Sequence, residues 1–182
     1  ETLLVHKDIA EKVLPDLVGI FKEKQVELVG CVKTCQIIPE LTPAHESDWD
    51  MEYNDLKLSI KIVDSFSEAV KFINKHGSGH TDVIITEDRK RAEQFLNEIS
   101  SSSVMWNAST RFADGFRYGL GAEIGISTNR THARGPVGLE GLVIYKYKLY
   151  GNGQVAGDYS GANAREFTHK PLGVRLDHDG SV

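Results

Sequence analysis

The sequence is poor in the residues that would point to several classes of protein. Among 182 residues it has two cysteines, five prolines and only 8% aromatic residues. Two cysteines cannot build a disulfide framework, so a reducing compartment, the cytoplasm, is expected. No apolar run approaches the ~20 residues that cross a bilayer. With 21 basic residues against 26 acidic ones, no broad basic surface is expected, which argues against nucleic acid or an anionic membrane as a partner.

What remains is the composition of a globular protein, with 40% hydrophobic and 26% charged residues. The length fits one domain and is too short for two large ones. The chain begins with Glu1, and the apolar run of residues 3–5 follows at once. No targeting peptide is visible, and the sequence looks as though it begins inside a structural element.

Short apolar runs alternate with amphipathic segments along the first half of the chain. Strands are expected at residues 3–6, 26–32, 56–62, 82–86 and 103–106. Helices are expected from about Pro15, after a capping box at Ser65 and Glu68, and around Ala92 to Ile99. Residues 34–53 lack periodicity and are predicted to form a solvated loop. Strands and helices in this order predict an α/β fold with a mostly parallel sheet flanked by helices.

The composition changes after Trp106, because 11 of the 17 glycines lie between Gly115 and Gly161. One further strand is expected at 143–150, where Tyr145, Tyr147 and Leu149 share a face that has no obvious partner later in the chain. An uncovered strand pairs with whatever is available, so we expect an oligomerisation strand. The alternative is an extra strand of the same domain. The predicted division is a domain at 1–138, the oligomerisation strand and turn at 139–159, and a polar tail at 160–182.

Two motifs that could carry chemistry are rejected. Cys31 and Cys35 have no second ligand pair for a metal, so no metal site is predicted. They are interpreted as ordinary thiols, because no histidine or helix N-terminus is expected beside them to stabilise a thiolate. The glycines of residues 119–125 superficially resemble a dinucleotide loop, but no strand leads into them.

The loop after residues 103–106 is the strongest candidate site. It carries two hydroxyls and two guanidinium groups, Ser109, Thr110, Arg111 and Arg117. Ligands of parallel α/β sheets collect beyond the carboxyl ends of the strands, and the planar fork of arginine suits carboxylates and phosphates. The loop is therefore either an anion-recognition loop or a structural loop with surface arginines, in which Arg111 is tied to Asp114.

Four segments of the sequence resemble one known family. Residues 106–127 and 132–141, together with 80–87 and 1–6, are similar to the γ-glutamyl phosphate reductases, a branch of the aldehyde dehydrogenase superfamily. The resemblance runs from Glu1 to about Tyr159 and is weak from Phe21 to Asp50. It implies an aldehyde dehydrogenase-like catalytic domain and the NADPH-dependent reduction of L-glutamyl 5-phosphate to L-glutamate 5-semialdehyde and phosphate, a step of proline biosynthesis. The alternatives are a non-catalytic oligomerisation or interaction module, or another aldehyde dehydrogenase.

The resemblance also implies roles for individual residues. In the family a cysteine thiolate attacks the acyl phosphate and expels phosphate, and NADPH reduces the resulting thioester. That cysteine stands directly before the motif that begins here at Glu1, so no catalytic residue is expected in this chain. The chain corresponds to a catalytic domain cut just after its nucleophile, without the nucleotide-binding domain, and is expected to be inactive alone.

The remaining expectations concern binding. The carboxylate of the substrate is assigned to Arg111, with Ser109 and Thr110 as supporting donors, and the phosphate to Arg117. Glu52 is aligned with the glutamate that binds the nicotinamide ribose of the cofactor, and the alternative is a surface glutamate in an acidic loop. The expected partners are the substrate, a second copy of the chain and, through functional coupling, glutamate 5-kinase.

Overall fold

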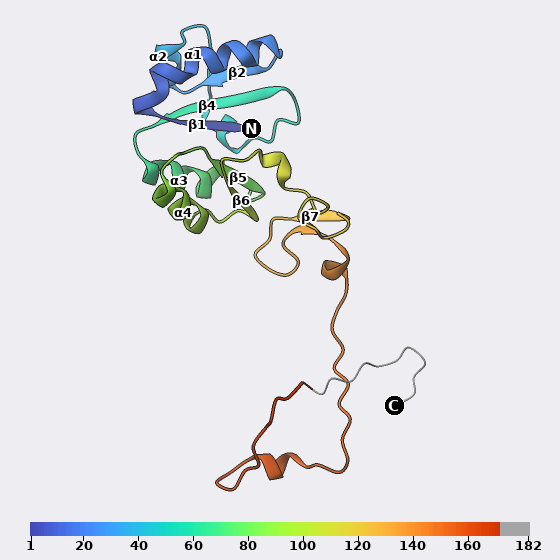
Figure 1. Cartoon of the computed structure of the whole chain (residues 1–182). Helices are drawn as coiled ribbons and strands as arrows, with labels where there is room; N and C mark the ends of the chain where they lie inside the picture. The colour runs from blue at the N-terminus through green and yellow to red at the C-terminus, as the bar shows by residue number, and fades with distance from the viewer. Residues whose placement is uncertain (172–182) are drawn as a thin grey trace. The chain divides into compact units, whose positions relative to one another are not determined.

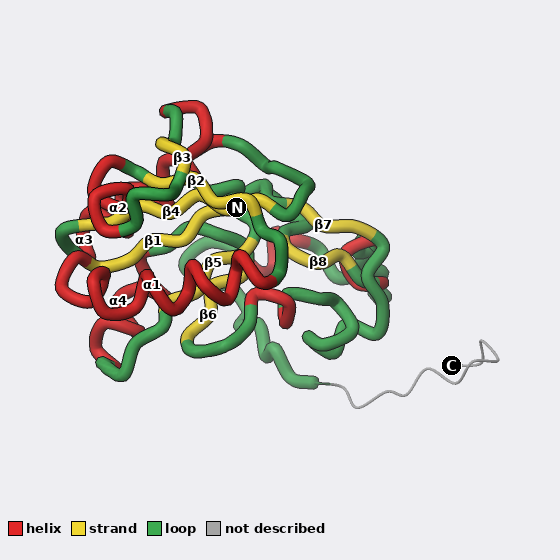
Figure 2. Tube along the Cα trace, turned by 90° about the horizontal axis from the view of Figure 1, so that it is seen from above, coloured by secondary structure: helices red, strands yellow, loops and turns green. Residues whose placement is uncertain are grey.

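The computed structural model describes residues 1–171 of the chain. The chain divides into two compact units, Glu1–Val143 and a second that begins at Ile144. Each unit is described by itself below. The first unit contains all the long helices and strands described here, and Figures 1 and 2 show their arrangement.

A four-stranded sheet lies at the centre of the first unit. Its strands are β1 (Thr2–His6), β2 (Glu27–Gly30), β3 (Thr42–Pro43) and β4 (Lys57–Val63), in the order β1-β4-β2-β3, and every pair is parallel. Ser59 of β4 stands opposite Thr2 on one side and Val29 on the other. β4 is therefore paired on both sides at Ser59 and Ile60, whereas Lys61 to Val63 pair with β1 alone.

One face of this sheet is covered by α1 (Lys7–Glu23) and α2 (Val32–Ile37) (Figure 1). The apolar stripe of α1, with Ala10, Leu14 and Val18 buried, packs on the strands. The buried residues of this core are Val5, Ala10, Leu14, Val18, Leu28, Ile38, Leu41, Ile60 and Ile62. Burial of these side chains is the main stabilising contribution, at about 1.5–3 kcal/mol for each large one.

A second parallel pair follows along the chain. It consists of β5 (Thr81–Ile84) and β6 (Ser103–Trp106), connected through α4 (Arg89–Glu98). The helix α3 (Phe66–His76) joins β4 to β5. A smaller core forms where Val70 of α3 packs with Phe95 of α4 and with Ile99 at the end of α4. The alternation of strands and helices from residue 57 to 106 confirms the α/β prediction, but β5 and β6 form their own sheet.

The Ser65 half of the predicted capping box is present at the start of α3, whereas the Glu68 side chain bonds the residue before the cap. The Glu68 N–H donates to Ser65 Oγ at 3.2 Å, and Glu68 Oε2 accepts from the Asp64 N–H at 2.7 Å. The carboxylate therefore satisfies the backbone N–H just before the cap residue.

Two predictions about the first 53 residues are wrong. The helix α1 begins at Lys7, not near Pro15, because the His6 side chain caps it by accepting from the Asp8 N–H. Pro15 lies inside α1, where burial of Leu14 and Val18 on the strands compensates for the backbone hydrogen bond that proline cannot donate. Residues 34–53 are not one solvated loop, since they contain most of α2, the short strand β3 and a 3₁₀ helix, η1 (Glu46–Asp50).

The glycine-rich region contains the 3₁₀ helix η2 (Thr110–Phe112), an antiparallel pair, β7 (Gly125–Ser127) and β8 (Gly135–Val137), and the 3₁₀ helix η3 (Leu139–Leu142). Residues 143–150 do not pair with any strand among residues 1–171, contrary to the expectation of a formed strand. The side chains of Ile144 and Tyr147 are each 94% exposed. A strand needs a neighbouring backbone, which this single chain does not supply here, so the oligomerisation strand remains a prediction.

The described part of the second unit, residues 144–171, has one short 3₁₀ helix, η4 (Ala156–Tyr159). The rings of Tyr159 and Phe167 stack with centroids 5.0 Å apart. Arg165 pairs with Asp158 at 3.6 Å and also donates its backbone N–H to the Asp158 carbonyl. The expected polar tail, 160–182, lies outside the described residues beyond position 171.

Candidate functional site

The loop that carries the predicted anion site is anchored where β6 ends. Asn107 has a φ of +50°, a left-handed conformation that asparagine tolerates better than most residues. Its side-chain amide donates to the Thr86 carbonyl and accepts from the Thr86 N–H, both at 2.9 Å. The Trp106 indole N–H also donates to Thr86 O at 2.9 Å. Asn107 thus continues the β5–β6 pairing beyond the strand and sets where the loop departs. Sequence reasoning did not single it out.

The next three residues form the exposed part of the loop. Ser109 is the N-cap of η2, and its hydroxyl accepts from the Arg111 N–H at 3.3 Å. Thr110 and Arg111 are both exposed. Within residues 1–171, the Arg111 guanidinium has no carboxylate within 4 Å. The alternative in which Arg111 is tied to Asp114 is therefore wrong, and the positive charge of Arg111 is available to a ligand.

Arg117 takes the structural role that had been considered for Arg111. Its guanidinium lies 3.7 Å from the Asp114 carboxylate and donates to the Arg111 carbonyl at 2.7 Å. The Arg117 N–H donates to Asp114 Oδ1 at 2.9 Å. The two arginines therefore differ, since Arg117 closes the turn and Arg111 points a free charge outward.

Gly115 closes the other side of this turn. Its N–H donates to the Glu123 carboxylate at 2.7 Å, and a Cβ built on it would lie 2.5 Å from the Ala122 carbonyl oxygen. No side chain fits there without moving backbone. The glycines at 119 and 121 both have positive φ, but they follow a turn and precede β7 rather than joining a strand to a helix. The rejection of a dinucleotide-binding loop is thereby confirmed.

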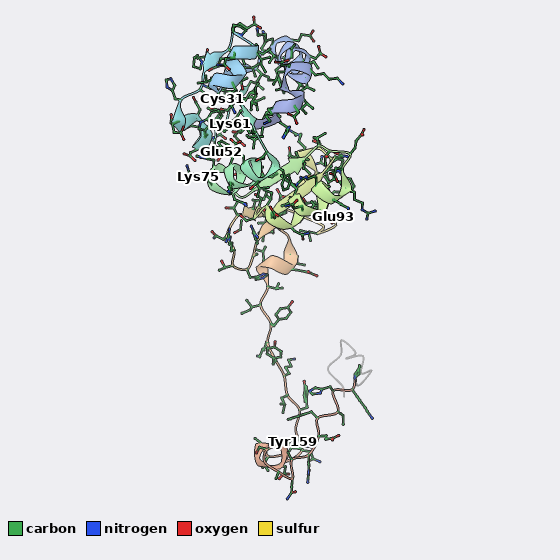
Figure 3. The ribbon with its side chains drawn as sticks, turned by 90° about the vertical axis from the view of Figure 1, so that its left-hand side faces the viewer. Cys31, Glu52, Lys61, Lys75, Glu93 and Tyr159 are labelled. Atoms are coloured by element: carbon green, nitrogen blue, oxygen red, sulfur yellow. The ribbon has the colours of Figure 1, made fainter. Side chains whose placement is uncertain are left out.

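Glu52 lies in the other candidate region, between η1 and β4. It is exposed, and it has no basic side chain within 4 Å among residues 1–171. Figure 3 shows it on the same side of the first unit as Lys61 and Lys75. A free carboxylate can accept from two vicinal hydroxyls, so its chemistry fits the ribose role assigned to it. Glu52 and the 109–117 loop belong to different parts of the fold, since Glu52 precedes β4 and the loop follows β6.

An open cavity of about 450 Å³ lies beside the 46–50 helix. The rings of Trp49, Phe72 and His76 and the ammonium groups of Lys61 and Lys75 line it. None of its lining residues belongs to the 109–117 loop, and Glu52 does not line it either. Ser109, Thr110, Arg111 and Arg117 are all exposed in the described structure. No cluster of metal ligands occurs among residues 1–171, and no helix in that part of the chain is long and apolar enough to span a membrane.

The expectation that no helix N-terminus lies beside Cys31 is wrong. The 32–37 helix, α2, begins directly after it, so Cys31 occupies the N-cap position, although its side chain makes no capping hydrogen bond. Burial acts to raise the pKa of the Cys31 thiol, but hydrogen bonding with the Thr34 hydroxyl at 3.3 Å and with the Ile62 N–H at 3.4 Å brings it below its ordinary value. Burial raises the pKa of Cys35. The sequence analysis did not predict α2, because a helix of this length shows no clear periodicity in the sequence.

Cys31 is expected to react with a thiol reagent before Cys35 does. A thiolate is the attacking species, so a lowered pKa increases the reactive fraction at neutral pH. The measurement is the rate of iodoacetamide labelling at each site, followed by peptide mass spectrometry between pH 6 and pH 10. The labelling of Cys31 should reach half its maximum at a lower pH than that of Cys35. Equal profiles would contradict the assignment of a stabilised thiolate.

Comparison with known proteins connects this geometry to a family. The aldehyde dehydrogenase family model matches residues 58–121, from β4 to the glycine-rich region. The chain is 56% identical over 172 residues to a γ-glutamyl phosphate reductase of Acetivibrio thermocellus, covering 94% of this chain and 39% of the relative. A γ-glutamyl phosphate reductase of Methanococcoides burtonii is 56% identical over 181 residues, covering 97% of this chain and 40% of the relative. The resemblance to the γ-glutamyl phosphate reductases is confirmed.

Solved structures agree with this result. The crystal structure of a γ-glutamyl phosphate reductase from Thermotoga maritima matches with a TM-score of 0.82 at 48% identity, over 85% of this chain and 37% of that one. A propionaldehyde dehydrogenase from Clostridium phytofermentans matches at 16% identity with a TM-score of 0.51, over 75% of this chain and 39% of that one, which supports the fold alone. The aldehyde dehydrogenase-like α/β fold is thereby confirmed. The chain spans about 40% of the length of the curated relatives it matches.

Proposed function

We propose that this chain is the carboxyl-terminal part of an NADPH-dependent γ-glutamyl phosphate reductase, which reduces L-glutamyl 5-phosphate to L-glutamate 5-semialdehyde and phosphate in proline biosynthesis. The observation that carries the proposal is 56% identity over 94% of the chain to a relative of that name. The nucleophilic cysteine and most of the cofactor site belong to the part of the protein upstream of Glu1. The 39% of the relative that the chain covers supports this division.

In this proposal the chain contributes binding groups rather than the reacting thiolate. Arg111 holds the carboxylate of the substrate through its free guanidinium fork, and the hydroxyls of Ser109 and Thr110 add donors beside it. Arg117 holds the phosphate less directly, because its guanidinium already bonds the Arg111 carbonyl and pairs with Asp114. Glu52 accepts from the hydroxyls of the nicotinamide ribose. The cofactor supplies hydride when it is bound.

The proposed reaction and the described structure also support a source of the substrate, a location and a mode of assembly. An acyl phosphate hydrolyses readily in water, so a glutamate 5-kinase has to supply it in functional coupling with this protein. The two cysteines of the described structure are free thiols, which supports a cytoplasmic location. Exposed apolar side chains in residues 143–150 support assembly with a second copy through that segment.

The test uses the reverse reaction, because glutamate 5-semialdehyde is more stable than the acyl phosphate. The complete protein is expected to reduce NADP⁺ when semialdehyde and phosphate are both present. The 1–182 chain alone is expected to show no such activity, since it has neither the nucleophile nor most of the cofactor site. NADP⁺ reduction by the purified chain would contradict the division proposed here. A complete protein that oxidises semialdehyde without phosphate would favour another aldehyde dehydrogenase.

A further inference from the structure

The segment around Glu52 is held from two directions, although Glu52 itself is exposed. One set of contacts fixes Tyr53 to β4, and the other fixes Trp49 and Asp50 to α3. Glu52 thus lies in an irregular segment with a fixed residue on either side. Functional side chains are commonly positioned in this way, by neighbours whose own rotamers are fixed.

The first set of contacts is a directed chain of hydrogen bonds. The Asp48 carboxylate can only accept, and it accepts from the His45 N–H at 2.7 Å and from the Tyr53 hydroxyl at 2.9 Å. The Tyr53 oxygen lies 2.6 Å from Ser59 Oγ, and since its own proton is given to Asp48, Ser59 is the donor. Ser59 is fully buried in the central strand β4. The residue next to Glu52 is therefore bonded to the middle of the sheet.

The protonation states of Asp48 and Tyr53 agree with the donors and acceptors assigned to these hydrogen bonds. The His45 N–H holds the pKa of Asp48 below its usual value, so Asp48 is ionised at neutral pH. Burial raises the pKa of Tyr53, which keeps its hydroxyl protonated and able to donate. The Lys57 ammonium lies 5.0 Å from the centre of the Tyr53 ring and pairs with Glu27 at 2.8 Å. Tyr53 is thus fixed at its ring as well as at its hydroxyl.

The second set of contacts joins η1 to α3. His76 Nδ1 lies 2.7 Å from Asp50 Oδ1, and because the carboxylate only accepts, the imidazole donates from Nδ1. The His76 side chain is only 8% exposed and packs against Phe72, with ring centroids 4.5 Å apart. Trp49 meets Phe72 edge-on at 5.6 Å. The end of η1 is therefore fixed to α3 just before Glu52.

We propose that Tyr53, through Asp48 and Ser59, and His76, through Asp50, are positioning residues that hold the Glu52 carboxylate against the two hydroxyls of the nicotinamide ribose. This inference rests on the ribose role of Glu52 in the proposed function. Neither Tyr53 nor His76 touches the cofactor. Each acts by restricting the backbone on one side of Glu52, so that the carboxylate meets both hydroxyls without first losing conformational freedom.

The experiment measures equilibrium binding to the complete protein, without turnover. Two probes are compared: NADPH and an analogue whose nicotinamide ribose lacks both hydroxyls. The quantity of interest is the ratio of the two dissociation constants, which reports only interactions with those hydroxyls. In the unaltered protein this ratio should be about 10 to 100, as expected for hydrogen bonds to a charged group. Thermal unfolding of each variant is recorded alongside.

Glu52→Gln should lower the ratio toward about 1–3, and this variant tests the proposed function by itself. Tyr53→Phe and His76→Phe should each lower the ratio by about 2- to 10-fold, the range of one neutral hydrogen bond. His76→Asn places a side-chain N–H near the Nδ1 position and should restore most of the ratio. Glu46→Gln, an exposed carboxylate of the same segment, is the matched control and should leave the ratio unchanged.

The outcomes separate the two claims. An unchanged ratio in Glu52→Gln would remove the ribose role of Glu52. A ratio that falls in Glu52→Gln but not in Tyr53→Phe or His76→Phe would overturn the positioning role alone. A variant of Tyr53 or His76 that unfolds at a lower temperature but keeps the ratio would also overturn the positioning role, because it would show that the contact only stabilises the fold. If Tyr53→Phe does not fold, the comparison of His76→Phe with His76→Asn decides.

Discussion

Replacing Arg111 with alanine is expected to lower kcat/KM for glutamate 5-semialdehyde about 10- to 100-fold in the complete protein. The guanidinium is exposed and has no carboxylate partner within 4 Å among residues 1–171, whereas Arg117 is engaged within its own loop. A charge-assisted bidentate pair with the substrate carboxylate is worth about 1.5–3 kcal/mol, which corresponds to this loss. Arg111→Lys should recover only part of it, because an ammonium restores the charge but not the fork.

The control substrate is an uncharged aldehyde of similar length. It has no carboxylate for Arg111, so Arg111→Ala should change its oxidation little. Arg130→Ala, which removes another exposed arginine of the glycine-rich region, should leave both substrates unaffected. Equal losses on the two aldehydes in Arg111→Ala would mean that the 109–117 loop has collapsed, and the recognition role would be withdrawn.

The second large effect is expected in the state of assembly. Prolines at Ile144 and Tyr147 should convert the associated complete protein into a monomer. The segment 143–150 is extended without a strand partner among residues 1–171, and its apolar side chains are exposed, so a second copy can add to it through the backbone. Proline has no N–H to donate and is excluded from the interior of a paired strand.

Light scattering of the complete protein measures this change. The matched control is the pair Lys146→Ala and Lys148→Ala, which alters side chains of the same segment but keeps every backbone N–H. It should associate as the unaltered protein does. A proline variant that still associates normally would show that the joint lies elsewhere.

The local structure of the first unit could be predicted where a signal lies within a few residues. The pattern of Ser65 and Glu68 located the start of α3, because the two hydrogen bonds that these side chains accept join residues close in sequence. The alternation of short strands with amphipathic helices gave the α/β class, since only a crossover helix joins such parallel strands. The sequence also pointed to the loop after β6, where the structure leaves Arg111 exposed, and its binding role stays a prediction.

Other features depend on contacts between residues far apart in the chain. Ser59, in the strand expected at residues 56–62, is fully buried because β4 lies between β1 and β2, and its hydroxyl bonds Tyr53. The lowered pKa of Cys31 depends on Thr34 and also on the Ile62 N–H, which is 31 positions away in sequence. No local pattern contains that information.

The features of the candidate site also fall into those that follow from the sequence and those that depend on the fold. The sequence by itself showed the resemblance to the γ-glutamyl phosphate reductases, the residue types of the 109–117 loop and the position of Glu52, because these depend on the identity of the residues in order. Only the tertiary structure decided which arginine is free, since Asp114 lies close in sequence to both Arg111 and Arg117 and the turn closed by Gly115 brings it to Arg117. It also decided that Glu52 is held between β4 and α3, because the Ser59 and His76 contacts form only when the chain is folded.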